Sequence, residues 1–281
     1  MGNNTATETP APQLPAKDSE QHAVREAFVE MLFALAVAQV AVHVADVWKL
    51  SDSLSAKSPA FAHLFLALTL IAASWVGWKR SRSPGMRRSV ESVFSRSFVG
   101  LLVDVILVVI YFIIVRQVEI EQKGDVIVLL PASAKPEAGG LAAVFVVYGV
   151  WDLLTDVFSQ GCIPKSLGVL AWTSKASRLA AVSTFASALC MGLSWLAYWR
   201  ATLVDPKHDG LQVFLIDVAL LSVVLVFRAA KAAENPLSRW LKVTDCEAFK
   251  RTRAVQGNEL RWCIALLLVY AVALVLATRG T

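Results

Sequence analysis

Residues 98–115 read F-V-G-L-L-V-D-V-I-L-V-V-I-Y-F-I-I-V, and this stretch decides the fold of the chain. Asp104 is its only charged residue. A helix of about 20 apolar residues is long enough to cross a hydrocarbon core of about 30 Å. The stretch therefore predicts a transmembrane helix that carries one acidic side chain.

Apolar blocks of similar length recur on both sides of this stretch. The seven predicted spans are 27–48, 59–78, 95–115, 140–159, 179–199, 211–229 and 260–278. The composition agrees, because 56% of the 281 residues are hydrophobic and 17% are charged, whereas about a quarter of the residues of an average soluble domain are charged. The sequence thus predicts an all-α polytopic membrane protein and excludes a soluble cytosolic enzyme.

The basic residues are distributed unevenly between the two sides of the predicted bundle. If the N-terminus is inside, 19 of the 27 lysines and arginines fall in inner segments. Cytoplasmic loops carry an excess of these residues. The predicted orientation is therefore N-inside and C-outside, in the cell (inner) membrane.

The third and sixth spans resemble each other in sequence. Around Asp104, L-L-V-D-V-I-L-V-V-I-Y-F (101–112) aligns with F-L-I-D-V-A-L-L-S-V-V-L (214–225) around Asp217. Three spans per unit is an odd number, so a second copy would enter the membrane upside down. This similarity predicts a 3+3 inverted repeat followed by one further helix.

The predicted segments follow from this arrangement. They are a disordered N-terminal tail (1–22), a first three-helix repeat (23–116), an outer loop (117–139), a second three-helix repeat (140–230), a basic amphipathic inner segment (231–258) and a seventh helix (259–281). Within the outer loop, residues 117–130 alternate around a glycine-containing turn and can form a β-hairpin. Small residues in the fifth span recur every four positions and can serve packing within the chain or a contact between copies. They are Ala180, Thr184, Ala188 and Gly192.

The order of three helices, three inverted helices and one more resembles that of the trimeric intracellular cation channels. The resemblance is architectural and implies a cation channel. That family carries paired glycines within its second and fifth helices, whereas the corresponding spans here have only Gly77 and Gly192. The pore chemistry of the family is therefore not carried over to this chain.

Asp104 and Asp217 are the main candidates for a functional role. Each lies about eight residues inside its span, or about 12 Å at 1.5 Å per residue, one measured from the inner surface and the other from the outer. A charged carboxylate in the bilayer costs about 2.5 kcal/mol or more, so one that persists usually faces protein or water. The two acids predict a cation or proton path. The alternative is that both form hydrogen bonds between packed helices.

Other polar residues at helical spacing in the first and fourth spans are candidates to line such a path. They are Gln39, His43, Asp46, Asp152 and Asp156. His63 begins the second span at the same outer depth as His43 and can share its proton chemistry. Two such histidines can hold a haem, but histidines near span ends are more often interfacial. We therefore expect no cofactor and no metal site.

A basic helix is predicted after the sixth span, beginning at Pro236. Its candidate lipid-binding residues are Arg239, Trp240, Lys242, Lys250 and Arg251. We expect them to lie on the inner surface against anionic lipid. The alternative is a basic connector without lipid specificity. No aromatic-interleaved binding module accompanies these charges, so nucleic acid is not an expected partner.

The usual motifs for nucleotide hydrolysis, zinc proteolysis, serine hydrolysis and potassium filtration are missing from the sequence, and no catalytic residue is assigned. We therefore expect a small cation or proton channel or transporter. The alternative is a non-conducting sensor, scaffold or effector subunit. Such a subunit would recruit a cytoplasmic partner through the basic loops at 79–96 and 228–259. A membrane enzyme that acts on lipids is a third possibility, because intramembrane Asp and His can support acid–base chemistry, but no nucleophile constellation stands out.

Overall fold

The structure is a computed structural model of the 281-residue chain. The backbone is described for residues 16–81, 96–118, 120–123, 126–130, 133–154, 169–204, 210–240 and 258–278. Side chains are described for residues 24, 26–79, 98–118, 129–130, 133–154, 176–204, 210–231 and 261–278.

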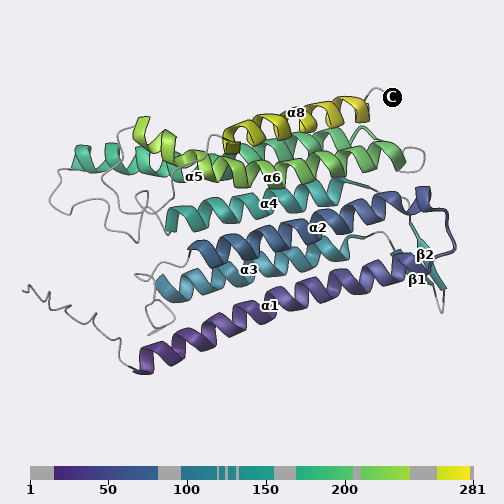
Figure 1. Ribbon diagram of the computed structural model, residues 1–281, viewed down its shortest axis with the longest axis horizontal. Coiled ribbons are helices and arrows are strands. Elements are labelled where there is room, and N and C mark those ends of the chain that lie inside the picture. The colour runs from purple at the N-terminus through teal and green to yellow at the C-terminus, as the bar shows by residue number, and fades with distance from the viewer. Residues whose placement is uncertain are drawn as a thin grey trace, which may run out of the picture.

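The described chain folds into seven helices and one pair of short strands. The helices are α1 (Ala16–Lys49), α2 (Leu54–Ser81), α3 (Arg96–Arg116), α4 (Lys135–Asp152), α5 (Val169–Ala201), α6 (Gly210–Trp240) and α8 (Asn258–Thr278). They lie roughly along one common direction, and consecutive helices run in opposite senses (Figure 1). The bundle therefore has two ends, with the start of α1 at one and the end of α8 at the other.

Six of these helices are long and apolar enough to cross a membrane. Their apolar stretches are Glu26–Lys49, Leu54–Lys79, Phe98–Arg116, Ala176–Ala201, Gly210–Lys231 and Arg261–Thr278. The remaining helix, α4, has 18 residues and carries Lys135 and Glu137 near its start and Asp152 at its end. The prediction of a multi-pass helical membrane protein is thus confirmed, with α4 as the one predicted span outside this set.

The outward surface of the bundle is strongly apolar. Trp48 is 72% exposed, Phe65 58% and Leu268 62%, and many other large apolar side chains also point outward. A soluble monomer rarely exposes a continuous apolar surface of this kind, because water makes it unfavourable. Hydrocarbon removes that penalty, so the surface fits a bundle that is surrounded by lipid.

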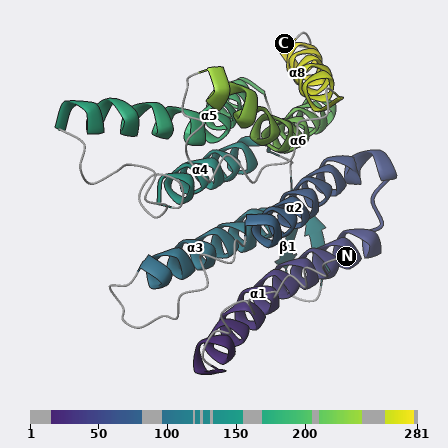
Figure 2. The ribbon, with the colours of Figure 1, turned by 60° about the vertical axis from the view of Figure 1, so that its left-hand side comes forward.

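The helices form two groups that meet along α2 and α6. α1 packs against α2 and α3, and α4, α5, α6 and α8 form the second group (Figure 2). Contacts of α2 with α6 and of α3 with α4 join the groups. In the apolar stretch of α6 61% of residues are buried, against 22% in α1, so α6 lies at the centre and α1 at the edge.

One glycine allows the two groups to approach closely. Gly140 of α4 faces the side chain of Ile114 at the end of α3, and a Cβ at position 140 would lie 2.7 Å from Cγ1 of Ile114. Real Cβ atoms do not come so close, so α4 can pack here only because residue 140 lacks a side chain.

The small-residue ladder of α5 packs only partly within the chain. Ala180 and Thr184 are half-buried, whereas Ala188 is exposed and Gly192 has nothing within 4 Å of its Cβ position. The interpretation of the ladder as internal packing is therefore wrong for its second half. The buried face of α5 instead carries another set of small residues. It comprises Ser183, Ala186, Ser187, Cys190, Ser194 and Ala197.

Two short strands lie in the segment for which a hairpin is predicted. β1 (Ile120–Lys123) and β2 (Val126–Leu129) pair antiparallel, with Ile120 opposite Leu129. The fold is therefore helical with one added strand pair, which connects α3 to α4 at the end of the bundle near the α1–α2 turn (Figure 1).

Several helices extend beyond the predicted spans. α1 begins at Ala16 rather than at 27, so the prediction of disorder is wrong for residues 16–22. α4 begins at Lys135 rather than at 140, and α5 begins at Val169 rather than at 179. α6 continues to Trp240, beyond the predicted end at 229. In α6 the charges at Arg228 and Lys231 suggested a membrane surface. In the structure Lys231 points into the bundle instead, where it forms an ion pair with Asp152.

Candidate functional site

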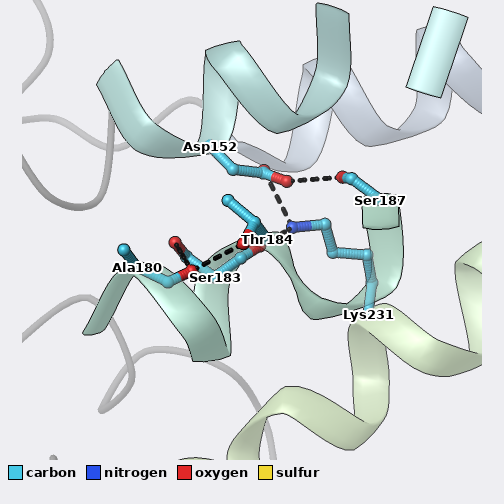
Figure 3. A network of polar contacts seen from close by, with 6 residues as sticks. All are labelled: Asp152, Ala180, Ser183, Thr184, Ser187 and Lys231. Carbon is cyan, nitrogen blue, oxygen red and sulfur yellow. Dashed lines mark hydrogen bonds and ion pairs between the residues drawn. The ribbon is translucent and has the colours of Figure 1, made fainter. Parts of the chain in front are cut away.

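The clearest polar site of the described bundle is built around Asp152, the last residue of α4. Oδ1 of Asp152 lies 2.8 Å from Nζ of Lys231 on α6, and the hydroxyl of Ser187 on α5 donates to Oδ2 over 2.8 Å (Figure 3). The side chain of Asp152 is 5% exposed and that of Lys231 is 23% exposed. Three helices thus contribute to one largely buried ion pair.

The cation of this pair has a second acceptor. Nζ of Lys231 donates to the backbone carbonyl of Ser183 over 3.1 Å (Figure 3). That carbonyl is available beside the site because α5 presents small residues to α6. A buried charge is tolerated only when it is paired and hydrogen-bonded, and both partners here meet that condition.

The backbone stays helical directly after Asp152. Leu153 has φ −61° and ψ −46°, and its N–H is directed to the carbonyls of Gly149 and Val150. Asp152 is therefore held by a regular last turn of α4.

An aromatic ring separates the ion pair from a neighbouring polar cluster. Phe227 stacks on Tyr148 with ring centroids 5.0 Å apart and an interplanar angle of 21°. The charged groups of Lys231 and Arg228 each lie 5.9 Å from the Phe227 ring. Two cations of α6 therefore approach one aromatic ring in the interior, and both gain from its electron-rich face.

A chain of three hydroxyl groups crosses the junction of the two helix groups. The hydroxyl of Tyr148 donates to Ser74 over 2.5 Å, and Ser74 donates to the carbonyl of Leu70 over 2.6 Å. The Tyr111 hydroxyl, 3.0 Å from that of Tyr148, must then be the donor of that contact. The chain ends on a backbone carbonyl, which cannot pass a proton onward. It therefore ties α2, α3 and α4 together and is not a proton relay.

Asp104 is buried on α3 and faces α2. Its side chain is 6% exposed, and Nε1 of Trp78 donates to Oδ2 over 3.3 Å. The adjacent residue, Gly77, lies against the guanidinium of Arg228, which a Cβ at position 77 would overlap. Asp104 thus lies beside Trp78, and Arg228 lies beside Gly77, the preceding residue of α2.

Asp217 is buried on α6, at 2% exposure. The helices that carry Asp104 and Asp217 do not pack closely against each other in the described part of the chain. The two predicted path carboxylates therefore belong to different helix contacts, whereas Asp152 is joined directly to α5 and α6.

The polar stripe of α1 lies at the edge of the bundle. The amide of Gln39 donates to Nε2 of His43 over 2.9 Å, and Lys49 approaches Asp46 to 3.9 Å. All three predicted residues of the stripe are partly exposed. The spacing argument thus identified one helix face, and the structure brings Gln39 and His43 of that face into direct contact.

A second buried pair lies near the opposite end of α4. Nδ1 of His63 on α2 is 2.7 Å from Oε1 of Glu137, and the two side chains are 3% and 4% exposed. The other ring nitrogen, Nε2, donates to the carbonyl of Ile114 over 2.8 Å. Nε2 of His63 is therefore hydrogen-bonded to α3, whereas Nδ1 faces the Glu137 carboxylate as an ion pair without an aligned hydrogen bond.

Sequence reasoning identified Asp152 but not its partners, and did not single out Glu137. Lys231 was assigned to an inner loop because of its charge, and Ser187 is one of many small residues on α5. One signal was present: an acid inside a span requires a cation at similar depth, and Lys231 and Arg228 are the basic residues nearest to an apolar stretch of α6.

Several predicted residues lie outside the described part of the chain. They are Asp156, Lys242, Lys250 and Arg251, together with the side chains of Arg239 and Trp240. Nothing in the structure bears on their assigned roles.

No protein-family model, curated protein or solved structure matches this chain.

Proposed function

We propose that this chain is a multi-pass protein of the cell membrane that moves protons or small cations across the bilayer. Its charged centre is the pair Asp152–Lys231. The single observation that carries the proposal is this ion pair, held by three helices inside a bundle whose outer surface is apolar. Ionisable residues inside membrane proteins are costly and usually belong to ion or proton paths.

The pair has two states that differ by one proton. In one state Asp152 is ionised and compensates Lys231. In the other, a proton on Asp152 removes that counter-charge, which weakens the hold of the bundle on the ammonium group. Lys231 is partly exposed and can turn its ammonium group towards the inner surface, as long basic side chains do. Proton binding at Asp152 is thereby coupled to movement of Lys231.

Asp104 and Asp217 are proposed as path carboxylates on either side of the membrane centre. Their positions in the sequence place one nearer the inner surface and the other nearer the outer. On the edge helix α1, the residues Gln39, His43 and Asp46 would line the same path towards the outside. In this proposal Asp152 lies between these groups in the order of proton transfer.

The proposal includes the N-inside orientation and anionic lipid at the basic segment 231–258. It also includes the inverted repeat and its resemblance to trimeric intracellular cation channels. A half-turn that exchanges the two repeats would pair the α2–α6 contact with an α3–α5 contact. In the described residues α3 and α5 do not pack closely, so any such symmetry is approximate.

The test is flux through the purified full-length chain in proteoliposomes, measured separately for protons, potassium and sodium. We expect an ion gradient to drive flux in the natural chain. Asp152→Asn and Lys231→Met should each reduce it to the level of empty liposomes, because either change removes one of the two states. Asp104→Asn and Asp217→Asn should reduce it as well.

The matched control is Glu26→Gln, which changes a carboxylate that pairs with Lys79 at the end of the bundle. This variant should retain the flux of the natural chain. Flux that is absent from the natural chain for all three ions would refute the proposal and favour a non-conducting subunit. Flux that persists in Asp152→Asn and Lys231→Met would remove the pair from the mechanism.

A further inference from the structure

The second buried pair, His63–Glu137, joins three helices at the end of the bundle opposite to Asp152–Lys231. Glu137 and Asp152 are both on α4, about 22 Å apart at 1.5 Å per residue. The third partner is the carbonyl of Ile114 in the last turn of α3. That carbonyl also accepts the backbone N–H of Gln117 over 3.1 Å.

The contacts of His63 indicate how many protons the pair holds. A carbonyl oxygen only accepts, so Nε2 of His63 must carry a proton towards Ile114. Nδ1 of His63 and Oε1 of Glu137 lie 2.7 Å apart, too close for two lone pairs, so a second proton belongs to this ion pair, although Nδ1 makes no aligned hydrogen bond. Whichever atom holds that proton, the pair contains two protons and has no net charge.

Two buried oxygen atoms near the His63–Glu137 pair have no hydrogen-bond donor among the described residues. Oε2 of Glu137 and Oε1 of Gln117 are both buried without a hydrogen-bond partner there. The Gln117 oxygen lies 3.8 Å from the Cβ position of Gly140, one helical turn after Glu137 on α4. Buried acceptors in folded proteins almost always have a donor. Among the described residues these two oxygen atoms therefore lack a hydrogen-bond donor, which a bound species can provide.

We propose that Glu137 and His63 form a proton-binding site at the outer end of the bundle. A third proton from the outer side adds to Oε2 of Glu137, which becomes a neutral carboxyl group, while His63 keeps both ring protons as an imidazolium. The new O–H group of Glu137 then supplies a hydrogen-bond donor in the region where Oε1 of Gln117 is buried. The net charge of the pair changes from zero to plus one, and no bond between heavy atoms forms or breaks.

The charged groups on neighbouring elements are His43 and Asp46 of α1, Arg116 of α3 and Lys135 of α4. His43 lies within electrostatic range of His63, of Asp46 on its own helix and of Arg116 at the end of α3. Lys135 is directed towards the ring of Tyr198 on α5, 5.5 Å away.

This inference deepens the proposed function, on which its role in transport rests, because it names the proton as substrate and His63–Glu137 as the outer loading point. Binding itself can be measured without transport. The experiment is infrared difference spectroscopy of the full-length chain in detergent between neutral and acidic pH, with glutamate labelled with ¹³C at the side-chain carboxyl. The label separates Glu137 from the buried aspartates.

On acidification we expect a labelled carboxyl C=O band that Glu137→Gln removes and Glu26→Gln retains. Exposed glutamates take up protons as well, so the assignment rests on the difference between the natural chain and Glu137→Gln. His63→Gln should shift the wavenumber of the band, because the carboxyl group loses its ion-pair partner. Glu137→Asp is the second variant: it keeps a carboxyl group and should replace the labelled band by an unlabelled one.

Three results would overturn the assignment. The first is that no glutamate band appears while the chain stays folded, and the second is that the band persists in Glu137→Gln. The third is that sodium shifts the midpoint of the band, which would make the corner a metal-cation site. If the band appears but proteoliposomes show no flux, the proton-binding site stands and the proposed transport is refuted. If flux occurs but the band does not appear, transport stands and the proton-binding site is refuted.

Discussion

Lys231 illustrates how one side chain can hold a polar site together inside an apolar bundle. Replacement by methionine keeps most of the volume but removes the ammonium group that pairs with Asp152. Removal of one partner of a buried ion pair costs about 3–5 kcal/mol, and we expect about 3 kcal/mol for Lys231→Met because Lys231 is partly exposed. The measurement is thermal or denaturant unfolding in detergent.

The control for this prediction is the double variant Asp152→Asn/Lys231→Met. Without either charge, no uncompensated group remains, so most of the lost stability should return. A double variant that is as unstable as the sum of the two single variants would mean that the two side chains act independently.

Two glycines in long helices provide a matched pair of substitutions. Gly140→Ala should destabilise the chain by about 1–3 kcal/mol, because the new methyl group would lie 2.7 Å from Cγ1 of Ile114, a branched side chain that cannot swing away. Gly192→Ala meets nothing within 4 Å and should be neutral or stabilising by up to about 1 kcal/mol, since alanine is the better helix former. Equal effects of the two substitutions on the unfolding temperature would contradict this account.

At the residue scale, the sequence predicts where polar side chains sit but not which of them meet. Helical spacing correctly grouped Gln39 with His43, because both lie on one helix. Contacts such as Asp152–Lys231 and His63–Glu137 depend on how two or three helices are rotated and shifted against each other. That arrangement arises from the packing of many small side chains, which single-chain periodicity does not reveal.

The turn between α1 and α2 is fastened by a lysine that caps the first helix. Nζ of Lys57, a residue that is 8% exposed, donates to the carbonyl of Trp48 over 3.3 Å and to that of Leu50 over 2.5 Å. Carbonyl groups at a helix C-terminus lack intrahelical donors and carry partial negative charge, so a lysine there satisfies both needs.

Lys57→Met should therefore loosen the end of α1. Hydrogen bonds that involve a charged group contribute about 1.5–3 kcal/mol each, so we expect faster amide hydrogen exchange in residues 45–53 and a total loss of about 2 kcal/mol. Lys49→Met is the control, because Lys49 is 72% exposed and only approaches Asp46. Unchanged exchange in Lys57→Met would show that the turn does not depend on the cap.

At the scale of elements, apolar length predicts the helices well and their ends poorly. Six predicted spans coincide with apolar helices because about 20 apolar residues have few other stable arrangements. The end of α6 was misplaced because a charge normally marks the membrane surface, whereas Lys231 has an acidic partner inside. The start of α4 was misplaced for a similar reason, since Glu137 is buried against His63.

The described bundle has an apolar outer surface and carries two charged pairs, Asp152–Lys231 and His63–Glu137, inside, which is the arrangement expected for a bundle in lipid. The open question at this scale is α4, whose described residues include three charges. In Figure 1 α4 lies alongside α2 and α6 and extends from the strand pair towards the opposite end of the bundle. Glu137 and Asp152 both have partners in neighbouring helices, so their charges do not prevent α4 from crossing the membrane.

The number of crossings determines on which side the C-terminus lies. With α4, the chain crosses seven times and its termini lie on opposite faces; without α4, it crosses six times and both termini lie on one face. We expect reporter fusions at Met1 to be cytoplasmic and those at Thr281 to be external. A fusion between α4 and α5, in residues 155–168, should be cytoplasmic, because α4 has returned the chain to the inner side. A fusion in residues 117–134 is external in either case and serves as the control. Reporters on the same side at both termini, with residues 155–168 outside, would remove α4 from the set of spans and with it the path from His63–Glu137 to Asp152–Lys231.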